Sequence, residues 1–130
     1  MRWGRVVTAA VTAFVGSFVL VAVIVAGYAF KLGAAARGAP DPDRIQMFAE
    51  QVGPTWGPVL LAILTVGAAF VAAHKAIDPP FTGLMVGLFA AAMGLLPAWP
   101  PRFLHAGVFV VIALAGLFGG VAARRSALVR

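Results

Sequence analysis

The 130-residue chain contains no cysteine, and this absence excludes several kinds of site at once. Without thiols it can have no disulfide framework, no thiolate nucleophile and no cysteine metal site. Asparagine is also absent, and serine occurs only at Ser17 and Ser126. Charged residues make up 11% of the chain, whereas soluble domains carry about 25%. These polar side chains are too few to cover the exterior of a soluble domain.

Apolar residues, in contrast, are abundant: they make up 62% of the chain, and the mean hydropathy is +1.01. Four segments contain no Lys, Arg, Asp or Glu, namely residues 6–30, 56–73, 81–99 and 103–123. At a rise of about 1.5 Å per residue, each can cross a hydrocarbon core of about 30 Å, the second only barely. Backbone polar groups in lipid must be satisfied within the segment, so we expect helices.

These segments predict an all-α integral membrane protein with one domain over residues 1–130. Short connections after the second and third segments make neighbouring helices adjacent and opposite in direction, so we expect an antiparallel bundle of four transmembrane helices. The first segment is 25 residues long, whereas the apolar part of a signal peptide has about 7–15. It is therefore interpreted as a retained helix.

The distribution of basic residues predicts the orientation of the chain. Loops on the cytoplasmic side of a membrane carry an excess of Lys and Arg. With the N-terminus inside, the inner side carries Arg130 and five residues assigned to topology and lipid headgroups: Arg2, Arg5, Lys75, Arg124 and Arg125. The outer side then carries Lys31, Arg37, Arg44 and Arg102. We therefore expect a multi-pass protein of a cell membrane, a bacterial inner membrane, with both termini in the cytoplasm.

The longest polar stretch lies between the first two segments. Asp41 followed by Pro42 is typical of a helix start, and Gly53–Pro54 is a stop signal. Residues 42–52 are therefore predicted to form a short amphipathic helix at the outer membrane interface. Its apolar stripe is a candidate outer-surface contact for a partner and comprises Ile45, Phe48 and Val52.

Similar signals mark other helix ends. Asp78 before Pro79 predicts a helix cap at the third segment, and Thr55 predicts one at the second. Pro97 is expected to end or kink the third segment.

Small residues mark the expected helix contacts. The sequences GLMVG and GLFGG both contain GxxxG, and a further glycine lies in a small-residue patch of the second segment. Such residues let helix backbones approach closely in lipid. The candidate residues for helix packing or partner contact are Gly67, Gly83, Gly87, Gly116 and Gly120. Internal packing and docking of another copy or partner remain alternatives.

Residues that carry chemistry are scarce. Proton-coupled transport needs an embedded carboxylate, and no acid lies within a segment. His74 follows the second segment on the inner side, and His105 lies near the start of the fourth segment on the outer side. The two are therefore roughly 30 Å apart and cannot share one metal or haem. A single histidine could still be an axial ligand, but the simpler interpretation is an interfacial side chain. The sequence has no basic face with interleaved aromatic residues, so we expect no binding of nucleic acid.

These observations lead to a functional hypothesis. We expect no enzyme, no catalytic residues, no metal and no cofactor. The protein is predicted to be an accessory, assembly or stabilising subunit that contacts other membrane subunits or itself, surrounded by membrane lipids. The alternative is a small channel or transporter built from several copies.

Overall fold

The computed structural model describes residues 2–98 and 102–129, and every regular element in these ranges is helical. The order is α1 (Trp3–Ala36), α2 (Pro42–Ala73), α3 (Pro79–Leu95), a 3-10 helix η1 (Leu96–Ala98) and α4 (Phe103–Leu128). Three helices, α1, α2 and α4, are long and apolar enough to cross a membrane, and α3 is shorter and also apolar. The all-helical, membrane-type fold expected from the sequence is thereby confirmed.

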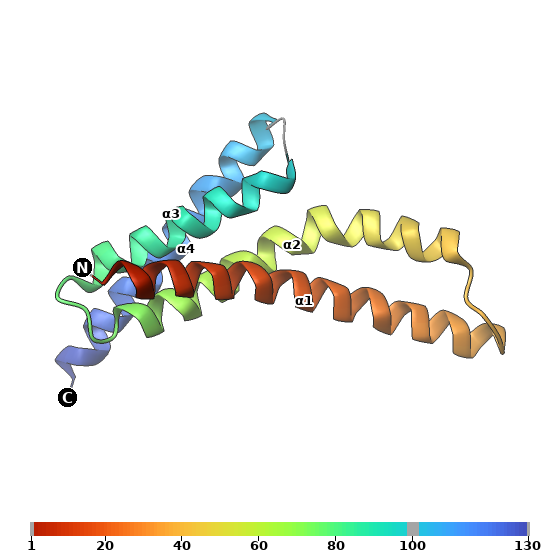
Figure 1. Cartoon of the computed structure of the whole chain (residues 1–130), viewed down its shortest axis with the longest axis horizontal. Coiled ribbons are helices and arrows are strands. Elements are labelled where there is room, and N and C mark those ends of the chain that lie inside the picture. The colour runs from red at the N-terminus through yellow and green to blue at the C-terminus, as the bar shows by residue number, and fades with distance from the viewer. Residues whose placement is uncertain (1, 99–101, 130) are drawn as a thin grey trace.

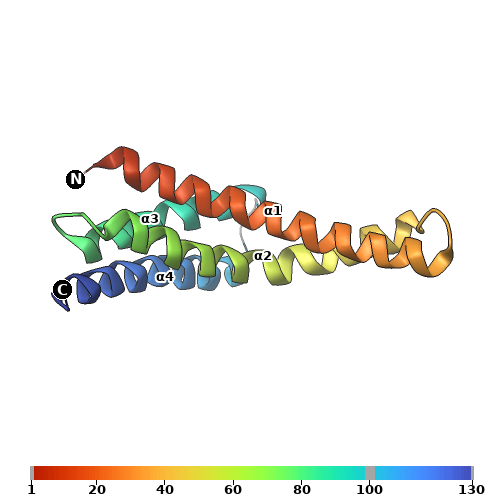
Figure 2. The ribbon, with the colours of Figure 1, turned by 90° about the horizontal axis from the view of Figure 1, so that it is seen from below.

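Consecutive helices reverse direction, so that the chain forms two hairpins, α1–α2 and α3–α4 (Figure 1). Both ends of the chain and the α2–α3 connection lie at the same end of the molecule, which we call the terminal end (Figures 1 and 2). The α1–α2 connection lies at the opposite end and extends well beyond the α3–α4 hairpin (Figures 1 and 2). The four helices therefore do not share one length.

The buried core lies toward the terminal end and is built mainly from small side chains. It includes alanines of three helices, at Ala10 and Ala13, at Ala69 and Ala72, and at Ala90 and Ala91. The largest completely buried apolar side chains are Ile112, Val6 and Val86. Small side chains let helix backbones approach closely, and in lipid such packing is a main source of helix association.

The described structure corrects the prediction of a separate helix over residues 42–52. Residues 42–73 form one continuous helix, α2, with Pro54 and Pro58 inside it. Proline normally disfavours the helical conformation of the residue before it, through a clash with that residue's Cβ. Here Gly53 and Gly57 precede the two prolines and have no Cβ. The predicted stop at Gly53–Pro54 is therefore wrong.

The helix ends match some sequence signals and not others. Asp41 and Asp78 are the N-caps of α2 and α3, and they accept hydrogen bonds from the N–H groups of Asp43 (3.0 Å) and Phe81 (3.5 Å). Both caps are as predicted. Thr55 is not a cap, because it lies inside α2 and its hydroxyl donates to the Gln51 carbonyl one turn back.

The end of the third predicted segment also differs in detail. Regular α-helix ends at Leu95, and Pro97 lies in the 3-10 helix that follows. Pro97 therefore lies where the α-helix ends, as the sequence indicated. The predicted boundary at Trp99 lies outside the described residues.

Candidate functional site

The glycines of the two GxxxG sequences lie in the contact between α3 and α4. A Cβ built on Gly83 would lie 2.5 Å from the carbonyl oxygen of Gly116, and one on Gly87 would lie 2.7 Å from that of Ala113. Conversely, a Cβ on Gly116 would lie 2.5 Å from the Gly83 oxygen, and one on Gly120 would meet the carbonyl of Pro79. The structure thus brings four of the five predicted packing glycines together inside the chain.

The fifth predicted glycine is placed differently, and another glycine takes its role. A Cβ on Gly67 would meet nothing within 4 Å, so this position is open. Gly119 was not predicted, yet it faces the Val66 carbonyl and Ala69 of α2. The signal was present in the sequence, because Gly119 adjoins Gly120 and a neighbouring position on a helix points toward a different partner.

The apolar stripe of residues 42–52 differs from its prediction as an outer-surface contact. Val52 is only 6% exposed, and Ile45 is half-buried. The ring of Phe48 stacks on Tyr28 of α1, with centroids 3.9 Å apart and planes inclined by 16°. Phe48 and Val52 thus pack within the chain itself, whereas the sequence predicted them as an outer-surface contact for a partner. The cause is the length of α1, which continues to Ala36 and runs beside this part of α2.

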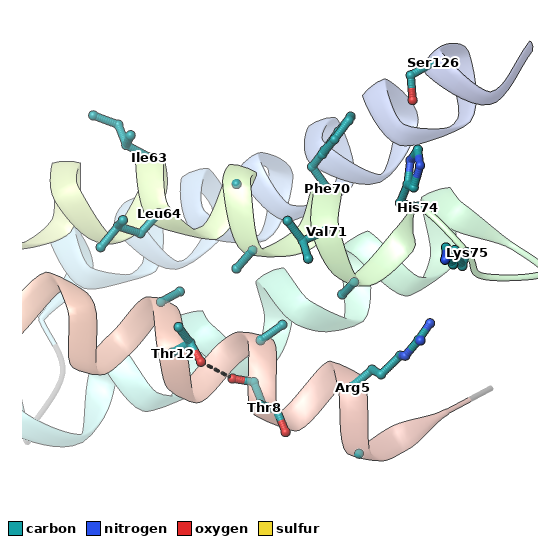
Figure 3. A pocket seen from close by; sticks show the side chains of 16 residues that line it. Arg5, Thr8, Thr12, Ile63, Leu64, Phe70, Val71, His74, Lys75 and Ser126 are labelled. Carbon is teal, nitrogen blue, oxygen red and sulfur yellow. Dashed lines mark hydrogen bonds between the residues drawn. The ribbon is translucent and has the colours of Figure 1, made fainter. Parts of the chain in front are cut away.

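The five basic residues assigned to topology belong to the terminal end. Arg2 and Arg5 lie at the start of α1, Lys75 lies just after α2, and Arg124 and Arg125 lie near the end of α4. Two of these residues, Arg5 and Lys75, line a groove (Figure 3).

This groove lies between α1 and α2 and has a volume of about 1020 Å³. Its walls are mostly apolar or small and include Ala9, Ala13, Leu64, Gly67 and Val71. Figure 3 shows Arg5, His74 and Lys75 together toward one end, whereas Ile63 and Leu64 lie toward the other. The groove therefore has a polar, cationic end and an apolar end.

Most hydroxyl groups along the groove are engaged within their own helices. Thr12 donates to the Thr8 carbonyl at 2.8 Å, and Ser126 donates to the Ala123 carbonyl at 2.8 Å. His74 is different, because its Nδ1 is buried and has no hydrogen-bond partner among the described residues. The imidazole lies near Phe70, with ring centroids 5.8 Å apart. Polar capacity thus remains unused at the cationic end.

A second, smaller cavity adjoins the cationic end. It has a volume of about 300 Å³ and is lined by Arg2, Arg5, Lys75 and Asp78, among others. Arg5 and Lys75 line both cavities. Arg124 and Arg125 line neither.

Side chains that could bind a metal are not clustered in the described structure. Among residues 2–98 and 102–129, no group of three or more His, Asp or Glu side chains is placed to hold a metal. The two histidines are at different helix ends, as expected from the sequence, and His105 Nδ1 accepts a hydrogen bond of 2.8 Å from the Arg102 N–H. His105 is thus occupied with the start of α4.

Comparisons with known proteins give no relative to reason from: no protein-family model, no curated protein and no solved structure matches this chain.

Proposed function

We propose that this protein is a non-catalytic membrane subunit that stabilises or assembles a larger membrane complex through helix–helix contact. The observation that carries the proposal is the exposure of α1. Only 17% of the most apolar 18-residue stretch of α1 is buried within the chain. The buried residues of α1 are Val6, Ala10, Ala13 and Ser17, all in its first half.

The second half of α1 is supported mainly by the facing part of α2. The α1–α2 hairpin extends beyond α3 and α4, so it lacks neighbours on its other sides there (Figures 1 and 2). Helix association in lipid depends on close packing, because lipid tails are as apolar as the side chains. A partner helix packed along α1 would supply contacts that the chain itself does not.

The proposed topology follows from the basic residues and the helix lengths. The terminal end, with its five basic residues, lies on the cytoplasmic side, and the four helices cross the membrane as an antiparallel bundle. With 32 residues, α2 is about 48 Å long, which exceeds a hydrocarbon core of about 30 Å. Residues 42–52 are therefore proposed to lie at or beyond the outer interface as an extension of α2.

Photocrosslinking in native membranes tests the partner contact. A photoreactive residue replaces Val23 in the second half of α1, which is 60% exposed, and the matched control site is Val111 of α4, which is 58% exposed. We expect a protein adduct from position 23 and only lipid adducts from position 111. Mild-detergent extraction and native mass determination should then show the chain migrating with a larger complex.

Two outcomes would contradict this proposal. Lipid adducts alone from both positions would show that α1 has no protein neighbour. A homo-oligomer of defined size that conducts ions or solutes in liposomes would favour the alternative function, a small channel or transporter.

A further inference from the structure

The groove between α1 and α2 has the length of one membrane leaflet. On α1 it extends from Gly4 to Ala13, and on α2 from Ile63 to Ala72, with His74 and Lys75 just after that helix. Nine residue steps on α1 correspond to about 14 Å along the helix axis. One leaflet of the hydrocarbon core is about 15 Å deep, half of the whole core. A single lipid chain that enters from the terminal end would therefore find walls along most of its length.

The walls of the groove suit an acyl chain. Gly67 contributes no side chain, and nothing lies within 4 Å of the place where a Cβ would stand. Short side chains also line the neighbouring wall, at Ala9, Ala13 and Ala68. Larger side chains, Ile63 and Leu64, lie toward the inner part of the groove (Figure 3). In lipid a hydrocarbon chain gains no hydrophobic free energy from such walls, because the surrounding lipid tails are equally apolar, so the favourable term is van der Waals contact between the chain and the groove.

The charge at the open end suits an anionic headgroup. Arg5 and Lys75 line both cavities, and Arg2 lines the smaller one. Within the described ranges the one ion pair joins Arg44 to Asp41, at the far end of the molecule, so Arg5 and Lys75 have no carboxylate within 4.0 Å there. Asp78 also lines the smaller cavity, and its carboxylate caps α3. Three cations and one acid leave a net positive charge around these cavities.

We propose that this groove binds one anionic phospholipid, with an acyl chain between α1 and α2 and the phosphate at Arg5 and Lys75. The cationic residues lie at one end of the groove and the larger apolar residues lie toward the other end. This order matches the headgroup and the acyl chain of a lipid. His74 also lines the groove and lies at the headgroup end. This site is independent of any protein partner along α1.

Native mass spectrometry of the detergent-purified full chain tests the site. The probes are phosphatidylglycerol and phosphatidylcholine with identical acyl chains. We expect one retained phosphatidylglycerol per chain and weaker retention of phosphatidylcholine. A basic residue near an anionic lipid surface contributes about 1 kcal/mol, so Arg5→Gln and Lys75→Gln should each weaken phosphatidylglycerol retention about fivefold.

Two matched controls separate the groove from general effects. Arg125→Gln removes one positive charge from the same end, but outside both cavities, and should leave retention unchanged. Gly67→Leu fills the groove and should abolish retention of both lipids. Gly27→Leu makes the same change on α1, at a position with nothing within 4 Å and outside the groove, and should leave retention unchanged. Circular dichroism checks that each variant keeps its helices.

The proposal would be overturned by equal retention of the two lipids by the unsubstituted chain. It would also be overturned if Arg125→Gln weakened retention as much as Arg5→Gln, because the effect would then come from overall charge. Unchanged retention in a helical Gly67→Leu variant would show that the acyl chain lies elsewhere.

Discussion

At the residue scale, the contact between α3 and α4 leaves no room for one additional carbon at its glycines. The nearest atoms to a Cβ on Gly83 belong to the backbone of Gly116 and Gly120, at 2.5 to 2.7 Å. Backbone cannot rotate away as a side chain can, so the two helices must separate. We therefore predict that Gly83→Ala lowers the free energy of unfolding by about 1–3 kcal/mol, as overpacking commonly does. Thermal unfolding in detergent measures this loss.

The matched control is Gly107→Ala in α4, where an added Cβ meets nothing within 4 Å. Alanine is the better helix former by about 1 kcal/mol, so this variant should be unchanged or slightly more stable. Equal stability of the two variants would mean that α3 and α4 are not in close backbone contact.

The glycine positions show how far a motif can be interpreted without coordinates. The GxxxG spacing identified four residues that face one another across α3 and α4, because three or four residues return a helix to the same face. It did not select Gly119, which lies outside this spacing and faces α2 instead of α3. It also could not show that Gly67 borders a groove, because a small residue can mark either a contact or an opening.

At the scale of the element, α2 shows a conflict between local and extended signals. Gly53–Pro54 is a strong local stop, and the sequence therefore predicted two helices where the structure has one. The local pattern contains no information about α1, which runs beside this part of α2. Phe48 of α2 stacks on Tyr28 of α1. Tertiary packing and a glycine before each proline outweigh the local preference, while the caps at Asp41 and Asp78 depend only on adjacent residues and were predictable.

Pro54 should weaken α2 locally, because it has no N–H to donate to the Glu50 carbonyl one turn back. We predict that Pro54→Ala restores this bond. One hydrogen bond contributes about 0.5–1.5 kcal/mol, so amide exchange at residues 55–57 should slow by roughly 2- to 12-fold. Hydrogen–deuterium exchange followed by mass spectrometry measures the change.

Pro42→Ala is the appropriate comparison for this experiment. Pro42 lies in the first turn of α2, where its N–H would have no helical partner in any case. Exchange at residues 55–57 should therefore be unaffected. If Pro54→Ala exchanged as fast as the unsubstituted chain, the helix would not be continuous through this position.

At the scale of the whole molecule, helix lengths and charges together support the proposed topology in a membrane. α1 has 34 residues and α3 has 17, which correspond to about 51 Å and 26 Å. A core of about 30 Å matches the shorter helix, so α1 and α2 must tilt or emerge. In the proposed topology the basic residues at the terminal end keep that end at an interface, and the opposite end of the hairpin is the part that emerges.

Single cysteines provide a direct measure of this arrangement, because the natural chain has none. We predict that Gln46→Cys, on the emerging part of α2, reacts with a membrane-impermeant maleimide in intact cells. Arg125→Cys, near the end of α4, should react only after the membrane is permeabilised. Both side chains are exposed in the structure, so neither is protected by the protein itself. Labelling of both from the same side would contradict the topology, because the two positions would then no longer be separated by the membrane. Labelling of Arg125→Cys alone in intact cells would instead invert the orientation, and would place the cationic groove in the outer leaflet.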